Sequence, residues 1–245
     1  MNTIDSLADR HVVVTGGTGA LGEAVVRRLL RAGATCHVPS RRSGDRAADA
    51  DAGADTHTDT HGGRLHVVHD VDLADQASVD RFYDGLPALW ASVHLAGGFV
   101  MAPIADASGA DFRRMIETNA LTAYLCSRAA VRAMRRADAG GRIVNVAARP
   151  GIEPRKGAQM AAYAASKAAV AAITLALAEE LKGERILVNA IAPSTLDTAA
   201  NRRAMPDADT SRWVSTDAAA EAVLQLVSPA NREISGAVLP LYARA

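Results

Sequence analysis

The sequence predicts an α/β fold, in which the strands of a parallel sheet alternate with covering helices. Two observations carry this prediction. Short apolar runs alternate with helix-length segments along the chain, and a glycine-rich turn joins the first apolar run to the first amphipathic segment. With 245 residues, 49% of them hydrophobic, the chain is long enough for one full core. We expect a single domain over residues 1–245, with a seven-stranded parallel sheet and helices on both faces.

The expected strands are short runs rich in Val, Ile and Leu that are bounded by Gly, Pro or polar residues. Seven such runs occur, at residues 11–16, 34–40, 65–71, 92–98, 142–148, 186–193 and 237–242. Helical segments separate them, of which the clearest are 21–33, 115–134, the alanine-rich segment from 160 onward, and 217–227. Because the stretch 43–63 is polar and lacks an apolar face, we expect a flexible loop there, and its His57 and His61 fit a solvated loop better than a metal site.

Composition limits the classes of partner. Lys and Arg balance Asp and Glu at 27 each, so the chain lacks the basic surplus typical of proteins that bind nucleic acid or anionic membranes. We expect a small-molecule partner, no nucleic acid and no membrane. No apolar run approaches the ~20 residues of a membrane span, and the polar start has no signal-peptide core, which favours the cytoplasm. Cys36 and Cys126 lie in apolar surroundings, so we expect buried reduced thiols and no metal.

A glycine-rich turn follows the first expected strand. The motif TGGTGALG lies between HVVVTG and an amphipathic helix. Glycines allow a tight turn and let backbone N–H groups and the helix N-terminus approach a pyrophosphate. A simple tight turn is the alternative, but the position within the first βαβ unit favours a dinucleotide site. The residues expected to contact the cofactor here are Gly16, Gly17, Thr18, Gly19, Ala20, Leu21 and Gly22.

The end of the second expected strand indicates which dinucleotide binds. An acidic residue about 20 positions after the glycines would bind the ribose hydroxyls of NAD, and none is present. Ser40, Arg41 and Arg42 stand there instead, and guanidinium groups suit the 2′-phosphate of NADP. We expect NADP(H), with NAD(H) as the alternative. After the third strand, Asp72 and Leu73 are expected at the adenine, although Asp72 could equally cap the next helix.

The alanine-rich segment MAAYAASKAAV carries a tyrosine and a lysine at helical spacing. Tyr163 and Lys167 are four residues apart and therefore share one helix face. A free phenol has a pKa of ~10 and exchanges protons poorly at neutral pH unless a nearby cation stabilises its anion. Lys167 can supply that cation, which makes Tyr163 a candidate general acid/base. A packed tyrosine beside a solvated lysine is the alternative interpretation.

Together these motifs resemble those of the short-chain dehydrogenase/reductase family over nearly the whole chain. The likeness rests on TGGTGALG, LAGG at 95–98, ETNAL, RIVNV, YAASK and VNAIAP at 188–193. The resemblance implies a single-domain Rossmann fold that binds NAD(P). It implies that Tyr163 is the general acid/base, that Lys167 binds the nicotinamide ribose and lowers the tyrosine pKa, and that Asn119 supports a proton-relay water. It also implies further cofactor contacts from Ala96, Gly97, Gly98, Pro193, Thr195 and Thr198, besides Tyr163 and Lys167.

One position departs from the family pattern. Most members have a serine at the end of the strand that aligns with RIVNVAARPG, where its hydroxyl binds the substrate carbonyl, whereas this chain has Ala147 and Ala148. Losing such a donor typically costs ~2.7 to 4 kcal/mol of transition-state stabilisation. Ser166 is a doubtful replacement because of its direction on the helix. Arg149, Arg155 and Gln159 could reach the site, although solvated loop residues are the simpler interpretation.

The segment 193–213, with SGAVLPL near the end of the chain, resembles the dihydropteridine-reductase subgroup, which also lacks the serine. This likeness implies reduction of a C=N group (an imine, an iminium or a quinonoid dihydropterin) or of an activated C=O group. Residues 194–213 are expected to form a lid that excludes water from hydride transfer. Met205 and Trp213 within it could line the pocket or equally pack against the core.

The function that we expect is therefore an NADPH-dependent reductase with Tyr163 as proton donor. A non-catalytic protein that senses NADP is the alternative: the missing serine favours it and the Tyr, Lys and Asn set opposes it. An epimerase or dehydratase is a third candidate, since the glycines also fit GxxGxxG, but such proteins usually have longer substrate domains. Small residues permit close helix contact, so we expect a homodimer or homotetramer built on the outer alanines Ala161, Ala162, Ala165, Ala168, Ala169, Ala171 and Ala172.

Overall fold

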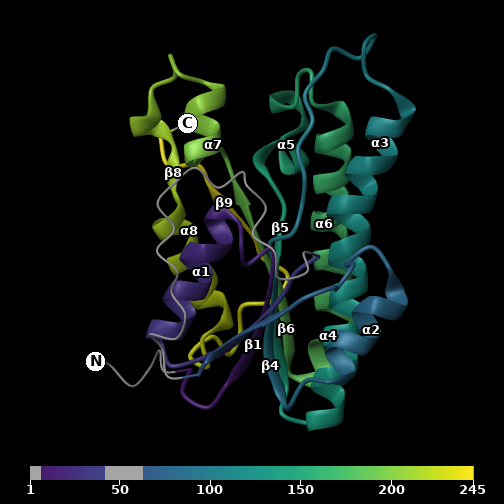
Figure 1. Cartoon of the computed structure of the whole chain (residues 1–245), viewed down its shortest axis with the longest axis vertical. Coiled ribbons are helices and arrows are strands. Elements are labelled where there is room, and N and C mark those ends of the chain that lie inside the picture. Colours follow the sequence, from purple (N-terminus) through teal and green to yellow (C-terminus); the bar gives the residue numbers. More distant parts are fainter. Residues whose placement is uncertain (1–6, 42–62, 245) are drawn as a thin grey trace.

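The structure, a computed structural model, describes residues 7–41 and 63–244 (Figure 1). Arg42, His57, His61 and nearly all of the expected loop 43–63 lie outside the described residues. Seven parallel strands form one sheet in the order β3-β2-β1-β4-β5-β6-β9, which confirms the predicted fold class. The strands are β1 (His11–Thr15), β2 (Thr35–Pro39), β3 (Leu65–Val68), β4 (Leu89–His94), β5 (Gly141–Val146), β6 (Ile186–Pro193) and β9 (Val238–Leu241).

Helices cover both faces of the sheet (Figure 1). Along a strand, successive side chains point to opposite faces. Val12 and Val14 of β1 therefore join the core beneath one helix layer, while Val13 joins the core beneath the other. The first layer contains α1 (Ala20–Arg31) and α8 (Thr216–Val227), and the second contains α2 (Gln76–Asp84), α4 (Thr122–Ala137) and α6 (Ala161–Glu180).

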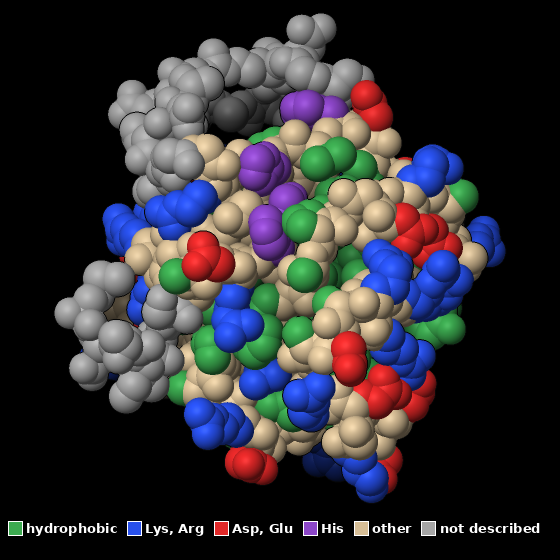
Figure 2. Space-filling view, turned by 90° about the horizontal axis from the view of Figure 1, so that it is seen from below, with side chains coloured by type: hydrophobic (Ala, Val, Ile, Leu, Met, Phe, Trp, Pro, Cys, Tyr) green, Lys and Arg blue, Asp and Glu red, His purple; other side chains and the backbone are tan. Residues whose placement is uncertain are grey.

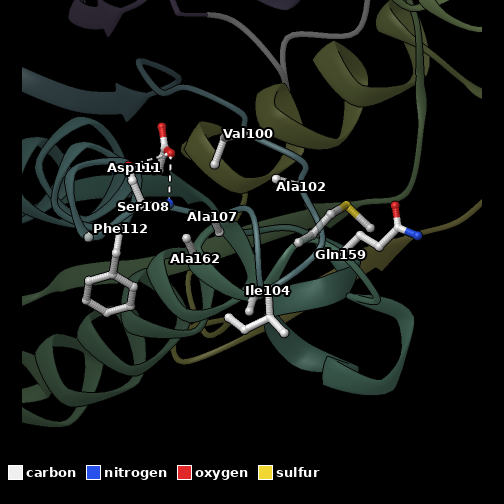
Figure 3. Close-up of a pocket in the computed structure, with 12 residues that line it drawn as sticks. Val100, Ala102, Ile104, Ala107, Ser108, Asp111, Phe112, Gln159 and Ala162 are labelled. Carbon is white, nitrogen blue, oxygen red and sulfur yellow. Dashed lines mark hydrogen bonds between the residues drawn. The ribbon is translucent and has the colours of Figure 1, made fainter.

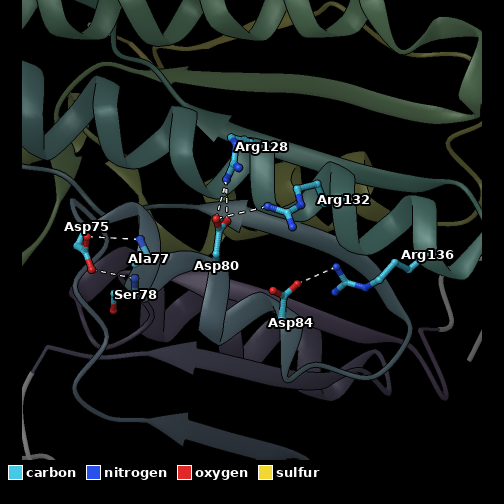
Figure 4. Close-up of polar contacts among 8 residues, drawn as sticks. All are labelled: Asp75, Ala77, Ser78, Asp80, Asp84, Arg128, Arg132 and Arg136. Carbon is cyan, nitrogen blue, oxygen red and sulfur yellow. Dashed lines mark hydrogen bonds and ion pairs between the residues drawn. The ribbon is translucent and has the colours of Figure 1, made fainter.

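Ion pairs fix α2 against α4 (Figure 4). The Asp80 carboxylate accepts hydrogen bonds from Arg128 at 2.7 and 3.0 Å and from Arg132 at 3.4 Å. One turn further on, Arg136 donates to Asp84 at 2.9 Å. The arginines occur at a helical spacing of four residues, so one face of α4 meets the acidic face of α2.

The N-terminus of α2 corrects one expectation. Its capping residue is Asp75, whose carboxylate accepts hydrogen bonds from the backbone N–H groups of Ala77 and Ser78 (Figure 4). Asp72 does not cap the helix, because it lies a turn too early; its carboxylate instead accepts a hydrogen bond from Ala74 N–H at 3.0 Å. Asp72 is thereby held at the carboxyl end of β3.

The shorter elements gather mainly at the carboxyl ends of the strands, the upper end in Figure 1. They are α3 (Gly109–Met115), a π-helical segment (Ile116–Leu121) that continues into α4, α5 (Arg149–Ile152), α7 (Ala199–Ala204) and a two-stranded parallel sheet of β7 (Leu196–Asp197) and β8 (Val214–Ser215). Single 3₁₀ turns occur at Pro154–Lys156, Lys182–Glu184 and Thr210–Arg212.

The third, fourth and fifth strands differ most from the prediction, and the third ends at Val68 rather than at residue 71. The fourth strand covers 89–94 rather than 92–98, so LAGG lies in a loop. The reason is that Gly98 N–H donates to the side chain of Asn119 at 2.9 Å and so leaves the strand ladder. The fifth strand likewise ends at Val146, ahead of Ala147 and Ala148.

Both cysteines lie in the core, as predicted. Cys36 and Cys126 are free and buried, and burial raises the pKa of each thiol to about 12. A thiol that stays protonated at neutral pH is a poor nucleophile. Both side chains therefore contribute packing rather than chemistry.

A row of buried hydrogen bonds crosses the sheet from α2 to α6. Because Asn145 Nδ2 donates to Thr174 at 3.0 Å, its Oδ1 accepts from His94 Nδ1–H at 2.7 Å. His94 Nε2 is then the acceptor for Ser92 O–H at 2.9 Å, and Ser92 in turn accepts from Tyr83 O–H at 2.8 Å. Burial lowers the pKa of His94 to about 4, so the ring is neutral at neutral pH and the row runs in this direction.

A second set of histidines crosses the first three strands. His11 Nδ1 lies 3.0 Å from His37 Nε2, and the ring of His37 stacks on His66 with centroids 5.1 Å apart. Figure 2, viewed from below, shows histidines gathered on this end of the molecule. Burial and the two neighbouring imidazoles lower the pKa of His37 to about 4.

We expect acid to destabilise the protein through these histidines. The pKa of His94 falls from 6.5 to about 4 on folding, so its contribution to stability is complete above pH 6.5 and is lost as the pH falls toward 4. The loss for His94 is about 3 kcal/mol, since one pKa unit is worth about 1.4 kcal/mol. Urea unfolding at a series of pH values measures it. In His94→Gln the free energy of unfolding should depend less steeply on pH, and an equal slope in both proteins would contradict this assignment.

Candidate active site

The glycine-rich turn is packed so tightly that most of its glycines admit no side chain. Gly16 has φ +66°, and a Cβ on it would lie 2.7 Å from the backbone nitrogen of Ala96. A Cβ on Gly17 would lie 2.8 Å from the Val38 side chain, and one on Gly22 would lie 2.0 Å from the carbonyl oxygen of Gly16. Because these glycines lack side chains, β1, β2, α1 and the loop that follows β4 can pack closely against one another.

Gly19 is different, because a Cβ there would meet only Gly16 O at 3.5 Å. Gly19 precedes α1, and no side chain caps that helix. Glu23, the acidic residue of this turn, is exposed, so the first-turn N–H groups and the positive end of the helix dipole form a cradle that no side chain caps. Such a cradle fits a pyrophosphate, so the residues present suit the predicted dinucleotide.

The cradle opens at the point where the strand order changes direction. β1 pairs with β2 on one side and with β4 on the other, and Leu95 N–H donates to Thr15 O at 3.1 Å just beyond the paired strands. Ala96 N–H then bonds the Thr15 hydroxyl at 3.3 Å. Open α/β sheets bind ligands in the crevice at such a switch point.

The remaining residues expected at the adenosine half lie along the same edge of the sheet. Ser40 directly follows β2, and its backbone bonds Val68 O and Val71 N–H, which ties the second and third strands together. Arg41 is exposed, and Leu73 is buried. Serine and arginine thus stand beyond the strand next to the glycine turn, as the sequence predicted for NADP.

Asn119 lies in the π-helical segment between α3 and α4 and is 1% exposed. Its amide Oδ1 accepts from Gly98 N–H at 2.9 Å, and its Nδ2 donates to Gly98 O at 3.1 Å and to Ser166 Oγ at 3.0 Å. Asn119 therefore joins the β4 loop to α6. The wider π turn is a common feature of functional sites, and no motif in the chain predicted it.

Lys167 lies inside the protein rather than in solvent. The residue is 6% exposed, and Nζ donates to the carbonyl oxygen of Val146 at 2.7 Å, at the end of β5. A Cβ on Gly97 would lie 3.5 Å from the same nitrogen. Burial lowers the pKa of Lys167 to about 8, so the ammonium form still predominates at neutral pH. The interpretation of Lys167 as a solvated lysine is therefore wrong.

Tyr163 lies one turn before Lys167 on α6, and the ring of Phe99 meets its ring edge-on with centroids 5.0 Å apart. Burial raises the pKa of Tyr163 to about 12. The protein by itself therefore shifts this pKa upward, opposite to the predicted lowering by Lys167, because Nζ is engaged by Val146 O and desolvation dominates. At neutral pH the phenol is protonated, which is the state that a proton donor needs.

The structure leaves no hydroxyl at the end of β5. Ala147 and Ala148 are 1% and 4% exposed. Ser166 does not replace the missing group, since its hydroxyl donates to Tyr163 O at 2.7 Å and accepts from Asn119. Arg149 bonds Glu153 at 3.0 Å and its guanidinium lies 4.4 Å from the centre of the Tyr242 ring. The Arg149 side chain is therefore held by Glu153 and Tyr242 rather than free in solvent.

Residues 194–213 follow β6 at the same edge of the sheet. Thr195 O accepts from Val214 N–H at 2.9 Å, and the Thr198 hydroxyl caps α7 by accepting from Asn201 N–H at 3.2 Å. Pro193 is the last residue of β6 and is buried. Met205 is 40% exposed, and Trp213 is partly buried.

A cavity of about 340 Å³ lies beside the start of α6 (Figure 3). Its walls come from the segment 100–112 and from residues 159–162, which directly precede Tyr163. Sequence reasoning missed this feature and also missed Phe99 as the neighbour of Tyr163. The apolar run GFVMAPI after LAGG was the available signal, since a loop that follows a strand rarely exposes so many apolar residues without a function.

The hydropathy of α6 departs from the expectation that the chain lacks a run long enough to span a membrane. By length and hydropathy alone α6 could cross a membrane, so the expectation that no apolar run approaches that length was wrong for Ala161–Glu180. This helix packs on β5 and β6 and carries Tyr163 and Lys167, and 39% of its apolar stretch is buried, so the core accounts for only part of its apolar character. Within residues 7–41 and 63–244, no group of three or more His, Cys, Asp or Glu side chains is arranged to hold a metal ion.

Comparison with known proteins agrees with this geometry. The short chain dehydrogenase family profile matches residues 10–209. Galactitol 2-dehydrogenase of Rhizobium johnstonii is 32% identical, over 97% of this chain and 95% of that protein, and cyclopentanol dehydrogenase of Comamonas testosteroni is 32% identical over 78% and 74%. The Pseudomonas aeruginosa RhlG/NADP active-site complex matches with a TM-score of 0.84 and 27% identity, over 99% and 98% of the two chains. The chain therefore belongs to the short-chain dehydrogenase/reductase family, whose members are oxidoreductases.

Proposed function

We propose that the protein is an NADPH-dependent reductase that transfers a hydride to a C=N group or an activated C=O group, with Tyr163 as proton donor. The observation that carries the proposal is the pairing of a protonated, partly buried phenol with a buried ammonium one helical turn away. The NADP in the RhlG complex supports the choice of cofactor, as do Ser40 and Arg41 at the edge of the glycine turn.

NADPH would supply the hydride when bound. The cradle at Gly19 and the N-terminus of α1 would hold its pyrophosphate, and Lys167 would reach the ribose next to the nicotinamide. The phenol of Tyr163 would deliver its proton to the nitrogen or oxygen that gains charge. The nearby Lys167 ammonium then stabilises the phenolate that remains, which lowers the barrier because the charge develops in a site of low dielectric.

The proposed acceptor is either a C=N group or an activated C=O group. A C=N acceptor is supported by the buried alanines at the end of β5, since an iminium already carries positive charge and needs no second hydrogen-bond donor. The relatives named above act on alcohols and sugar alcohols, which supports the carbonyl alternative. The likeness of residues 193–213 to dihydropteridine reductases places a quinonoid dihydropterin among the C=N candidates.

A substrate panel tests the proposal. The protein is mixed with NADPH or NADH and with simple ketones, cyclic imines, a sugar ketose and a quinonoid dihydropterin, while the absorbance of the reduced nicotinamide is followed. We expect turnover with NADPH on at least one C=N or C=O compound, and slower turnover with NADH. If every compound fails although NADPH binds, the proposed reductase is wrong.

The dependence of kcat/KM for reduction on pH should report the titration of the Lys167 ammonium group. Since its pKa is lowered to about 8, the ammonium is present below that pH and is lost as the pH rises through it. We expect kcat/KM for reduction to fall above pH 8 by about tenfold for each further pH unit. Lys167→Arg stays charged over the same range, so its residual activity should lack this decline. A wild-type profile that is flat to pH 10 would remove Lys167 from the mechanism.

A non-catalytic protein that senses NADP is the second candidate. One observation favours it: the end of β5 offers no hydroxyl to a substrate carbonyl. A sensor would bind NADPH with an affinity that the substrate panel does not change and would leave the cofactor reduced.

We also propose that residues 194–213 close over the substrate. A separate proposal is that copies of this chain associate through α4 and α6. Tyr124 and Leu175 on these helices are each 50% exposed, and Ala165, Ala172 and Ala176 are exposed as well. This apolar face supports a homodimer or homotetramer. Light scattering at micromolar concentration tests the assembly.

A further inference from the structure

We propose that the cavity beside the start of α6 is a subsite for an apolar arm of the substrate, so that the enzyme prefers carbonyl or imine compounds that carry an extended alkyl or aryl substituent. The inference rests on the proposed function and adds the class of substrate to it.

The cavity has the size and lining of a small-molecule site. Its volume of about 340 Å³ lies at the lower end of the range for ligand pockets, which is roughly 300–1,000 Å³. Apolar side chains form most of the wall, among them Val100, Ile104, Phe112 and Met160 (Figure 3). A volume of this size would hold an arm of several methylene groups.

Its position ties the cavity to the reacting group. Met160 and Ala162 in the wall lie just before Tyr163, and Val100 lies just after Phe99, whose ring meets the ring of Tyr163. Tyr163 and Phe99 do not themselves line the cavity, but each is next in the chain to a residue that does. A substituent on the reacting carbon would pass along Phe99 to enter the cavity.

Apolar residues around the entrance are unusually exposed for side chains of their type. Phe99 is 59% exposed, Met101 54% and Ile104 78%. Exposure of this kind beside a cavity marks a surface that a ligand covers. The three residues belong to one loop segment, 99–104, in which Val100, Ala102 and Ile104 line the cavity.

The residues that line the cavity supply no cation that would attract an anionic arm. Among the residues that line it, Asp111 carries the charge, and its carboxylate is already engaged. One oxygen accepts from Ser108 Oγ–H at 2.7 Å, and the other pairs with Arg114 at 2.6 Å. A carboxylate or phosphate on the arm would meet this anion without a free cation in the lining, whereas a neutral hydrocarbon would bury the exposed apolar wall.

A homologous series tests the subsite. The scaffold that turns over in the substrate panel is prepared with straight alkyl arms from ethyl to heptyl, and kcat/KM is measured for each. Burying one methylene supplies about a fourfold gain, so kcat/KM should rise about fourfold per methylene until the cavity is full. Ala107→Leu fills the cavity from its wall and should lower kcat/KM for the longest arm at least about tenfold, while the ethyl compound changes by less than about twofold.

Matched controls separate the subsite from a general effect. Ala110→Leu makes the same addition on the exposed surface of α3, outside the lining, and should leave the whole series unchanged. Ile104→Ala removes an exposed part of the wall without entering the core, and should reduce the gain per methylene even if Ala107→Leu folds poorly.

The outcomes are distinguishable. A series that turns over with kcat/KM independent of arm length overturns the subsite and leaves the reductase intact, whereas no turnover with any scaffold overturns the reductase itself. The cavity could instead accept a side chain from a second copy of this chain. If Ala107→Leu changes the molecular mass in light scattering and leaves the series untouched, that second occupant is correct and the subsite is wrong.

Discussion

Tyr163→Phe should lower kcat for reduction by roughly 10²- to 10⁴-fold, because it removes the proton donor and nothing else. The phenol is held by the ring of Phe99 and by its place on α6, and no described residue hydrogen-bonds its hydroxyl. The variant should therefore fold normally and still bind NADPH, losing at most the contact that the hydroxyl makes with the cofactor. Stopped-flow measurement of the hydride-transfer step, with fluorescence titration of NADPH, gives both quantities.

Tyr124→Phe is the matched control for this variant. Tyr124 is 50% exposed on α4, five residues after Asn119, and the substitution removes one hydroxyl from a side chain outside the cavity lining and the glycine turn. Its kcat should equal that of the wild type. Equal rates in Tyr163→Phe and Tyr124→Phe on every active compound would show that another group donates the proton.

Two glycine variants should separate folding from cofactor binding. In Gly22→Ala the new Cβ would lie 2.0 Å from Gly16 O, which is backbone and cannot turn aside. Alanine gains about 1 kcal/mol in helix propensity, but forcing α1 away from the turn costs more, so we expect a net loss of about 2 kcal/mol in the free energy of unfolding. Urea unfolding measures it.

Gly19→Ala should have the opposite pattern. Its φ of −89° suits alanine, and the new Cβ would meet only Gly16 O at 3.5 Å, so the free energy of unfolding should change by less than about 0.5 kcal/mol. The methyl group would nevertheless stand in the cradle, and we expect the Kd for NADPH to rise at least about tenfold. If Gly19→Ala binds NADPH as tightly as the wild type, the pyrophosphate does not lie at this turn.

The structure supports several predictions made from local pattern alone. The alternation of apolar runs and amphipathic helices depends on neighbours within a few residues, and it predicted seven parallel strands with helices on both faces. The glycine turn could also be predicted, because the strand, the four glycines and the helix that form it are adjacent along the chain. Likewise the spacing of Tyr163 and Lys167 was enough to put both on one helix face.

The errors in the predicted structure arose mainly where a residue contacts a partner that is distant along the chain. LAGG looks like the end of a strand, but Gly98 bonds Asn119, which is 21 residues away, and leaves the ladder. The cap of α2 was a local error: the helix begins at Gln76, and Asp75, directly before it, is the cap in place of Asp72.

By itself the sequence determined the order of strands and helices along the chain, the glycine turn and the placement of Tyr163 and Lys167 on one helix face, because each depends on residues that are close along the chain. Only the tertiary structure decided the protonation of that pair and the presence of the cavity. Burial raises the pKa of Tyr163 and lowers that of Lys167, and the loop 99–112 meets α6 from some fifty residues away. Desolvation and cavity shape are properties of many chain segments packed together, so no local pattern records them.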